Sequence, residues 1–448
     1  MSANHGLGWL GIARLGLVQA ALGAVVVLTT STLNRVMVVE LALPAVLPGL
    51  LVAWHYLVQM ARPRLGHGSD VGSRRTPWII GGMAVLATGG VGAALATVWM
   101  AQSPVAGMLL AFIAFALIGI GVSACGTSLL VLLAKRVEAP RRASAATLVW
   151  LMMIMGFAVT AGIAGKLLDP YSPQRLVLVT ASVSLLALVL TVLAMFRLEG
   201  PARVDAANDE PAALKPKFSV ALREVWADAT ARRFTIFVFI SMLAYSAQDL
   251  ILEPFAGTVF GFTPGASTQL SGVQHGGVLL GMVAAALAGR GRRFGSLQAW
   301  QIGGCLASAL ALLCLSMAGV AGPVWPFKAT VFVLGVANGA FSIAAIASMM
   351  RLASEGPPSR EGIRMGLWGA AQAIAFGFGG LIGTAASDVA RWLIGSPALA
   401  YSTVFALEAG LFVVAAVLAA RLGRQGAGSR AAPVQRGPLV ALHARGQS

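Results

Sequence analysis

The sequence predicts an all-α membrane protein with twelve transmembrane helices, arranged as two halves of six. Composition, the length of the apolar runs and the placement of basic residues all support this fold class. Of 448 residues, 58% are hydrophobic and only 11% are charged, whereas about 25% are charged in an ordinary soluble domain. A soluble fold cannot bury that much apolar surface, so the composition excludes soluble enzymes, disordered chains and secreted disulfide scaffolds.

Apolar runs of about 18 or more residues are long enough to cross a bilayer as helices. The predicted spans cover residues 15–33, 41–60, 77–99, 105–134, 144–168, 176–196, 232–252, 269–289, 298–318, 326–350, 364–388 and 399–421. The longest polar stretch, 197–231, separates the sixth span from the seventh. We therefore expect two six-helix halves joined by a polar connector.

The basic residues set the predicted orientation. If the N-terminus is cytoplasmic, 27 of the 32 Lys and Arg residues fall in cytoplasmic segments. The remaining five are Arg35, Lys166, Arg175, Lys328 and Arg391. Because Lys and Arg are retained on the cytoplasmic side of membrane proteins, we expect both termini in the cytoplasm and the protein in the bacterial inner membrane. The net charge of +16 then reflects topology and does not indicate a nucleic-acid partner.

Four regions follow from these patterns: a first half (1–196), a connector (197–231), a second half (232–421) and a cytoplasmic tail (422–448). The early connector is rich in Pro and acidic residues, which is typical of a flexible linker. Its later part has apolar residues at helical spacing and predicts an amphipathic helix on the cytoplasmic membrane surface. Those apolar residues are Phe218, Leu222, Val225, Trp226 and Ala229.

Catalytic and metal-binding motifs are not found in the sequence. The three cysteines, Cys125, Cys305 and Cys314, all lie within apolar runs and form no CxxC or Cys/His spacing. Hydrolase, metalloprotease and P-loop motifs are missing, as are paired Asp-rich motifs for prenyl diphosphate. We therefore expect no catalytic residues, no metal site and no enzymatic activity.

The loop after the second predicted span resembles the signature loop of the major facilitator superfamily. In that superfamily a Gly is followed by an Asp and then by two basic residues. The matching residues here are Gly66, Asp70, Arg74 and Arg75. Val71 and Ser73 depart from the superfamily pattern. The resemblance implies a latch between helix ends, and the alternative is a topology signal with ordinary interfacial ion pairs.

Three longer segments resemble the PucC/LhaA family, the light-harvesting assembly proteins of photosynthetic bacteria, also called the bacteriochlorophyll delivery branch of the superfamily. They are Leu15–Ala45, Gly68–Met83 and Ala247–Gly261. The resemblance implies assembly of antenna complexes in the cytoplasmic or intracytoplasmic membrane, with bacteriochlorophyll bound as cargo. It favours the core antenna (LH1) over the peripheral antenna (LH2). The implied partners are antenna polypeptides, the reaction centre and bacteriochlorophyll synthase.

Polar residues recur at matching positions where the first span of each half ends. Arg35 and Glu40 in the first half correspond to Gln248 and Glu253 in the second, and Asp249 lies four residues before Glu253. Two carboxylates on one helix face at a membrane edge are costly without a cation. We expect these five residues to form a polar cluster on the periplasmic side. It either binds or gates something, or it is a structural ion-pair network. Pro254 is expected to end its helix.

Two histidines lie inside predicted spans and are candidate pigment ligands. A neutral imidazole can ligate the magnesium of a chlorophyll through one nitrogen while the other is held by an acceptor. His55 is preferred, because the second span should line an interior surface, whereas His275 lies nearer the predicted periplasmic edge. The alternative for each is an ordinary histidine that hydrogen-bonds within a helix bundle.

The leading functional hypothesis is a non-catalytic antenna assembly factor. The alternative is a secondary transporter of a small or amphipathic solute, which needs convergent polar groups at the bilayer midplane. Here the midplanes look mostly apolar, which favours a tetrapyrrole over a polar solute.

Overall fold

The computed structural model describes residues 7–60, 74–199, 223, 226–288, 296–354 and 361–429. Gly66 and Asp70 of the predicted signature loop lie outside these ranges. So does most of the predicted surface helix in the connector, although Trp226 is described and is exposed. The tail is described only to Ser429, where the last helix ends.

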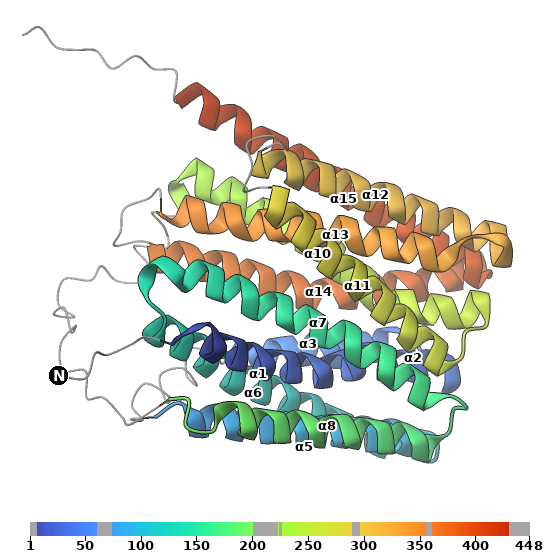
Figure 1. Ribbon diagram of the computed structural model, residues 1–448. Coiled ribbons are helices and arrows are strands. Elements are labelled where there is room, and N and C mark those ends of the chain that lie inside the picture. Colours follow the sequence, from blue (N-terminus) through green and yellow to red (C-terminus); the bar gives the residue numbers. More distant parts are fainter. Residues whose placement is uncertain are drawn as a thin grey trace, which may run out of the picture.

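Long helices that run side by side form a single bundle (Figure 1). The first half contains α1 (Trp9–Val27), η1 (Leu28–Thr32), α2 (Leu33–Arg35), η2 (Val36–Glu40), α3 (Val46–Gln59), α5 (Thr76–Met100), α6 (Pro104–Arg136), η3 (Ala139–Arg141), α7 (Arg142–Leu168) and α8 (Pro173–Met195). The second half contains α10 (Ala229–Phe260), α11 (Pro264–Ala288), α12 (Leu297–Ala321), η5 (Gly322–Val324), α13 (Phe327–Ser354), α14 (Glu361–Ile394) and α15 (Pro397–Ser429). The all-α fold class is confirmed.

Eleven helices in the described part are long and apolar enough to cross a membrane. The remaining predicted span, 41–60, is the second in the chain and corresponds to α3, which has 14 residues and begins only at Val46. The chain turns before that point, because Ala42 has a φ of 51° and Pro44 has no N–H to donate to a preceding turn. The predicted count of twelve is therefore met by eleven long helices and one shorter helix.

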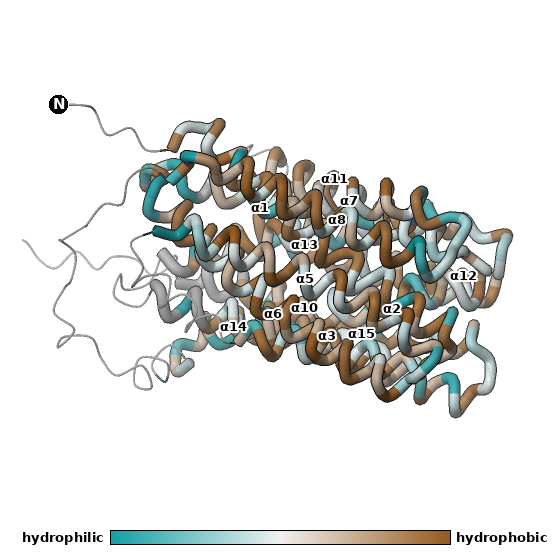
Figure 2. The backbone as a smooth tube through the Cα atoms, turned by 90° about the horizontal axis from the view of Figure 1, so that it is seen from below, coloured by the Kyte–Doolittle hydropathy of each residue, from teal (hydrophilic) through white to brown (hydrophobic). Residues whose placement is uncertain are grey.

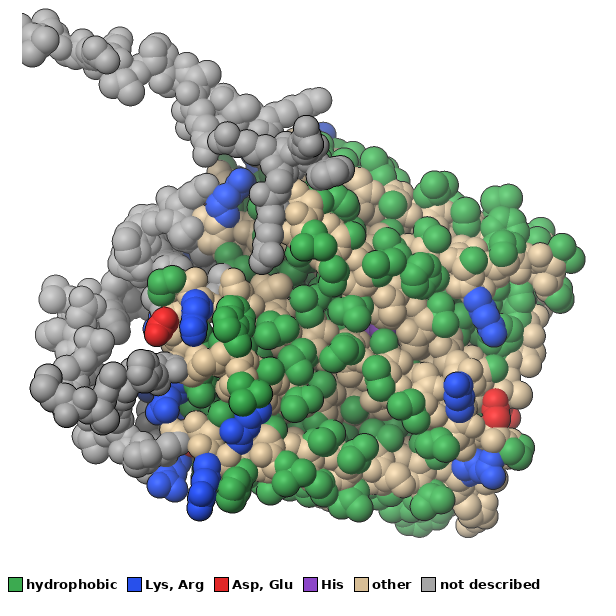
Figure 3. Space-filling model, viewed as in Figure 1, with side chains coloured by type: hydrophobic (Ala, Val, Ile, Leu, Met, Phe, Trp, Pro, Cys, Tyr) green, Lys and Arg blue, Asp and Glu red, His purple; other side chains and the backbone are tan. Residues whose placement is uncertain are grey.

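The start of α1 and the end of α15 lie at the same end of the bundle (Figure 1). We call this the terminus end and the opposite one the far end. Hydrophobic residues follow the length of the helices, and hydrophilic residues concentrate near the turns (Figure 2). In space-filling view, hydrophobic side chains cover the middle of the visible face, while Lys and Arg lie toward its two ends (Figure 3). This is the surface that a bilayer requires.

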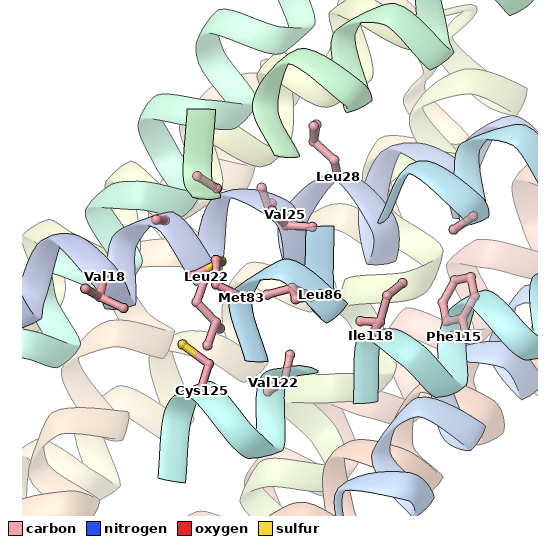
Figure 4. Packing of buried hydrophobic residues seen from close by; sticks show 14 of the residues in the cluster. Val18, Leu22, Val25, Leu28, Met83, Leu86, Phe115, Ile118, Val122 and Cys125 are labelled. Carbon is pink, nitrogen blue, oxygen red and sulfur yellow. The ribbon is translucent and has the colours of Figure 1, made fainter. Parts of the chain in front are cut away.

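Each half has its own hydrophobic core. In the first half, Leu22 and Val25 of α1 face Met83 of α5 and Val122 of α6 (Figure 4). Glycine lets α5 and α6 approach closely, since a Cβ on Gly82 would lie 2.5 Å from the backbone nitrogen of Cys125. A third, smaller cluster joins the halves by packing α7 against α11 and α13.

The helix of the first span extends past its apolar core, 15–33, into the polar stretch where its end was expected. Helical structure continues to Glu40 through two π-helical segments, η1 and η2, on either side of the short α2. Asn34 and Arg35 are consequently buried, with 1% and 2% of their surface exposed. Segments of π-helix shift the register of side chains around a helix axis and are frequent at functional sites. Here they turn the polar residues of the first span toward the second half.

The prediction that Pro254 ends its helix is wrong, since α10 continues to Phe260. Proline lacks the N–H that would bond to the carbonyl four residues earlier, which is that of Leu250. The side-chain amide of Asn34 donates a 2.6 Å hydrogen bond to that carbonyl from the other half. Because a long-range partner satisfies the freed carbonyl, the helix can pass through the proline. Rules based on local sequence cannot identify Asn34 as that partner.

We predict that Asn34→Ala lowers the free energy of unfolding by about 1–3 kcal/mol, because it leaves a buried carbonyl without a donor. In a Pro254→Ala background, residue 254 regains an N–H that can bond to the Leu250 carbonyl, so the cost of Asn34→Ala should fall. Thermal unfolding of the four purified variants in detergent measures this coupling. Thr97→Ala, which removes a buried hydroxyl bonded within its own helix, is the matched control. An equal cost of Asn34→Ala in both backgrounds would contradict this account.

Candidate functional site

Polar side chains of the first span bind the second half at the far end. Ser31 Oγ donates to Glu253 Oε1. Thr32 shares a 3.0 Å hydroxyl contact with Thr268, and Asn34 donates to the Leu250 carbonyl. We call this set of contacts, together with that of Arg35 described next, the polar seam. It joins η1 and α2 to α10 and α11.

Arg35 lies in the polar seam and makes contacts in both halves. Its Nη1 forms an ion pair with Glu40 of its own half, and its Nη2 donates to the Phe262 carbonyl at 2.5 Å. The guanidinium passes so close to α10 that a Cβ on Gly257 would lie 2.9 Å from Nη2. A buried cation needs both a counter-charge and acceptors. Glu40 and the Phe262 carbonyl supply them.

Further contacts close the far end around the seam. The carboxylate of Asp388, on α14, accepts hydrogen bonds from the backbone N–H groups of Ala45 and Val46 at 3.1 and 2.8 Å. These are free N–H groups at the start of α3, where a negative charge is favourable. Thr263 donates to Asp169 at 2.9 Å, which links the start of α11 to the connection between α7 and α8.

Directly behind the seam, a cavity of about 370 Å³ lies between the two halves. Its size is within the range of small-molecule sites, about 300–1,000 Å³. Four of the residues that the sequence singled out line it: His55, Asp249, Glu253 and His275. Arg35 and Glu40 lie in the seam instead. Gln248 is fully buried on α10, and neither of its amide atoms has a hydrogen-bond partner among the described residues.

The two histidines differ in how their ring nitrogens are held. His275 Nδ1 donates to the Ser271 carbonyl at 2.9 Å, and since a carbonyl can only accept, Nδ1 carries the proton. The lone pair of the neutral ring is therefore on Nε2. Phe157, from the first half, meets the His275 ring edge-on at 5.0 Å between centroids. His55 Nε2 instead lies 2.7 Å from the side-chain nitrogen of Gln59.

The acidic residues of the cavity all come from α10. Asp249 Oδ1 accepts a 3.1 Å hydrogen bond from Gln274 of α11. Glu253 is 2% exposed, and its Oε2 has no hydrogen-bond partner within the described part of the chain. No Lys or Arg is present among the described residues that line the cavity. Within the same ranges, no three His, Cys, Asp or Glu residues form a group that could hold a metal ion.

The expectation of a mostly apolar midplane is therefore incomplete. The predicted spans are apolar on average, but their few polar residues face the same cavity. Gln19, His55, Asp249, Gln274 and His275 come from four different helices and meet there. Hydropathy averaged along a helix conceals this convergence, because it discards the direction in which each side chain points.

A family model described as PUCC protein matches residues 32–427. The chain belongs to the PucC family. A chain of Rhodobacter capsulatus named "Bacteriochlorophyll synthase 44.5 kDa chain" is 55% identical, and the alignment covers 92% of this chain and 95% of that one. Protein PucC of the same organism is 31% identical over 92% of each chain. The family resemblance stated from the sequence is confirmed.

The fold resembles that of solved membrane transporters. A D-xylose–proton symporter superposes with a TM-score of 0.70 at 16% identity, covering 91% of this chain and 96% of the symporter. A bacterial homologue of the human lysosomal transporter Spinster gives a TM-score of 0.67 at 14% identity, covering 92% and 96% of the two chains. At such low identity the likeness shows the fold alone. It confirms the major-facilitator-like architecture of two six-helix halves.

At the terminus end, this PucC-family chain anchors the start of α5, where the predicted signature loop ends. Arg74 is exposed, and Arg75 is buried. Glu199, just beyond α8, accepts hydrogen bonds from the Arg75 and Thr76 amides at 2.6 and 2.7 Å and from the Thr76 hydroxyl at 2.6 Å. Burial opposes the charge on Glu199. The Thr76 and amide hydrogen bonds and the Arg75 charge outweigh it, so the pKa of Glu199 is lowered.

Several residues of the site were missed in the sequence. Ser31 and Asn34 precede Arg35 by four residues and one residue, and Gln274 precedes His275. One signal for Asn34 was available, because Pro254 must leave the Leu250 carbonyl without an N–H. No pattern in the sequence identified Asn34 as the donor to the Leu250 carbonyl, or predicted that Ser31 would hydrogen-bond to Glu253. Those pairings depend on how the halves pack.

We predict that Glu199→Gln lowers the melting temperature at neutral pH. A carboxyl whose pKa is lowered by folding stabilises the protein above its unfolded pKa of about 4.3, and this stabilisation is lost as pH falls through the folded pKa. The difference between wild type and variant should therefore be greatest above about pH 5 and shrink below about pH 4. Melting curves across that range test this. Glu138→Gln, at an exposed carboxyl paired with Arg141, is the control, and a pH-independent difference would count against the capping role.

Proposed function

We propose that this PucC-family chain is an assembly factor for the photosynthetic antenna that holds bacteriochlorophyll in the cavity between its halves and presents it to antenna polypeptides. The observation that carries the proposal is the cavity itself, with His275 Nε2 available beside an otherwise mostly apolar wall. Membership of the PucC family supports the antenna role. The name of the 55% identical relative, which links that protein to bacteriochlorophyll synthase, supports the cargo.

The geometry favours His275 over His55 as the magnesium ligand. The Ser271 carbonyl holds Nδ1–H of His275, and such an outer hydrogen bond orients a ligating imidazole and raises its basicity. The other nitrogen is then an acceptor for a metal. His55 Nε2 is already in contact with the Gln59 amide. The preference for His55 that the sequence suggested is therefore replaced in this proposal.

The cavity walls suit a flat, apolar ring. Leu22, Val26, Ile154 and Phe157 of the first half face Val278 and Phe376 of the second. Aromatic edges such as that of Phe157 pack favourably against a π-system. A tetrapyrrole between the halves would contact both of them at once.

In this proposal the chain is not a catalyst. It receives pigment from a partner enzyme, and bacteriochlorophyll synthase is the expected partner, together with the reaction centre and antenna polypeptides. The inner membrane is the expected location, with both termini in the cytoplasm. The exposed apolar side chains of α8, among them Leu178, Leu185 and Leu193, offer a surface for lipid or for antenna helices.

Secondary transport of a small or amphipathic solute is the second candidate. Polar groups that converge on a cavity between two six-helix halves favour it. The two candidates differ in what they bind. A pigment carrier retains a tetrapyrrole through gentle purification, whereas a solute transporter is pigment-free and moves its solute in proteoliposomes.

We predict that His275→Ala lowers the bacteriochlorophyll that co-purifies with the protein by about tenfold, because a lost axial ligand removes most of the specific affinity. His55→Ala should retain most of it. Pigment is extracted and quantified per mole of protein after mild detergent purification from a photosynthetic host. Melting curves of both variants report folding. Equal retention by both variants would reject His275 as the ligand, and a wild-type protein without pigment would reject the carrier role.

We also predict that a host lacking this protein accumulates less core antenna (LH1), with a smaller loss of peripheral antenna (LH2). The physical reason is that antenna polypeptides deprived of pigment leave buried polar groups unpaired in lipid and are degraded. Near-infrared absorbance of membranes measures both complexes. Complementation with the wild-type chain is the control. Normal levels of both antennae would contradict the assembly role, and a selective loss of LH2 would reverse the expected preference.

A further inference from the structure

The charge of the cavity limits what can enter it. Among its described lining residues, Asp249 and Glu253 carry carboxyl groups, and no Lys or Arg is present. Arg35 lies outside the cavity lining, and its guanidinium is engaged by Glu40 and by the Phe262 carbonyl. Among the described wall residues, the titratable bases are His55 and His275, and a histidine that ligates magnesium is neutral.

The wall residue Glu253 leaves one of its two carboxyl oxygens unpaired among the described residues. Glu253 is 2% exposed and lines the cavity, and its Oε1 is taken by Ser31. Its Oε2 has no hydrogen-bond partner in the described ranges. A buried polar atom in this state is uncommon in folded proteins and requires an explanation. A ligand group that hydrogen-bonds to it would provide one.

Neither protonation state of these carboxyls favours an anion. An ionised carboxylate repels a second negative charge, and like charges brought together in a binding site cost several kcal/mol. A protonated carboxyl is neutral and can donate a hydrogen bond to a ketone or ester oxygen. An uncharged ligand with carbonyl groups therefore fits in either state, whereas an anionic ligand finds no cation on the wall.

We propose that the cavity selects the uncharged, esterified form of the ring pigment and rejects its free-acid form. This rests on the proposed function, since it assumes that the cargo is a bacteriochlorophyll ring. The free-acid form differs by an ionised propionate, for which this wall offers no positive partner. Asp249 and Glu253 are thus specificity-determining residues, and the chain acts after the ring carboxylate has been converted to an ester.

The sharpest test compares two ligands that differ in charge, neither of which carries a long tail. Methyl bacteriochlorophyllide and free bacteriochlorophyllide are titrated separately into the purified full-length protein in nanodiscs at neutral pH, and binding is followed by pigment fluorescence. We expect the methyl ester to bind at least about tenfold more tightly. Bacteriochlorophyll itself is titrated as the positive control for pigment binding.

Asp249→Asn combined with Glu253→Gln should bring the two affinities to within about threefold, chiefly by tightening the free acid. Glu138→Gln, which removes an exposed carboxyl away from the cavity, should leave the ratio unchanged. If the double variant is unstable, Glu253→Gln alone should move the ratio in the same direction. The wild-type comparison needs no variant.

The outcomes separate the two levels of the proposal. If methyl ester and free acid bind wild type equally, or if the ratio survives removal of both carboxyls, charge selection by this wall is wrong while pigment binding stands. If none of the three pigments binds, bacteriochlorophyll itself included, the proposed function fails.

Discussion

The far end of the molecule depends on the cost of leaving a polar group unpaired in a bundle surrounded by lipid. In that environment, a buried N–H, carbonyl or charge that lacks a partner within the protein is costly. Pro254 frees the Leu250 carbonyl in the middle of α10, and Asn34 of the other half supplies the donor. The donor to this carbonyl comes from the other half of the molecule. The two halves are therefore held together by a hydrogen bond that the backbone needs, as well as by apolar packing.

The rest of the seam follows the same logic. The π-helical segments around α2 bring Ser31, Thr32, Asn34 and Arg35 onto the face that meets α10 and α11. Each side chain pairs with a group that would otherwise be buried without a partner. Arg35 adds a charge, which Glu40 and the Phe262 carbonyl compensate. Ser31 and Glu253 belong both to the seam and to the cavity wall, so the seam adjoins the cavity.

The position of the cavity explains why its wall can be polar inside an apolar protein. The seam holds the halves together at one end, and the helices of both halves contribute to the space behind it. Residues in that space are shielded from lipid, so two histidines, two carboxyls and several amides are tolerated there. The same shielding makes the sign of their charge selective, because interactions between charges are stronger where water is scarce.

The sequence by itself determined the fold class, the approximate positions of the spans, the family and the residue types that matter. These depend on hydropathy over about 18 residues and on local motifs, which are properties of contiguous segments. It also identified His55, Asp249, Glu253 and His275, since ionisable groups in a membrane span are costly wherever they lie.

Where the sequence misjudged an element, the reason was a distant partner. The helix α10 passes through Pro254 because Asn34 of the other half donates to the Leu250 carbonyl that the proline leaves free. Only the tertiary structure decided that Arg35 and Glu40 pair in the seam while His55, Asp249, Glu253 and His275 share a cavity. That division depends on the direction of each side chain and on contacts between residues more than 200 positions apart in the chain, such as Ser31 and Glu253. The local sequence pattern specifies neither the directions nor the contacts.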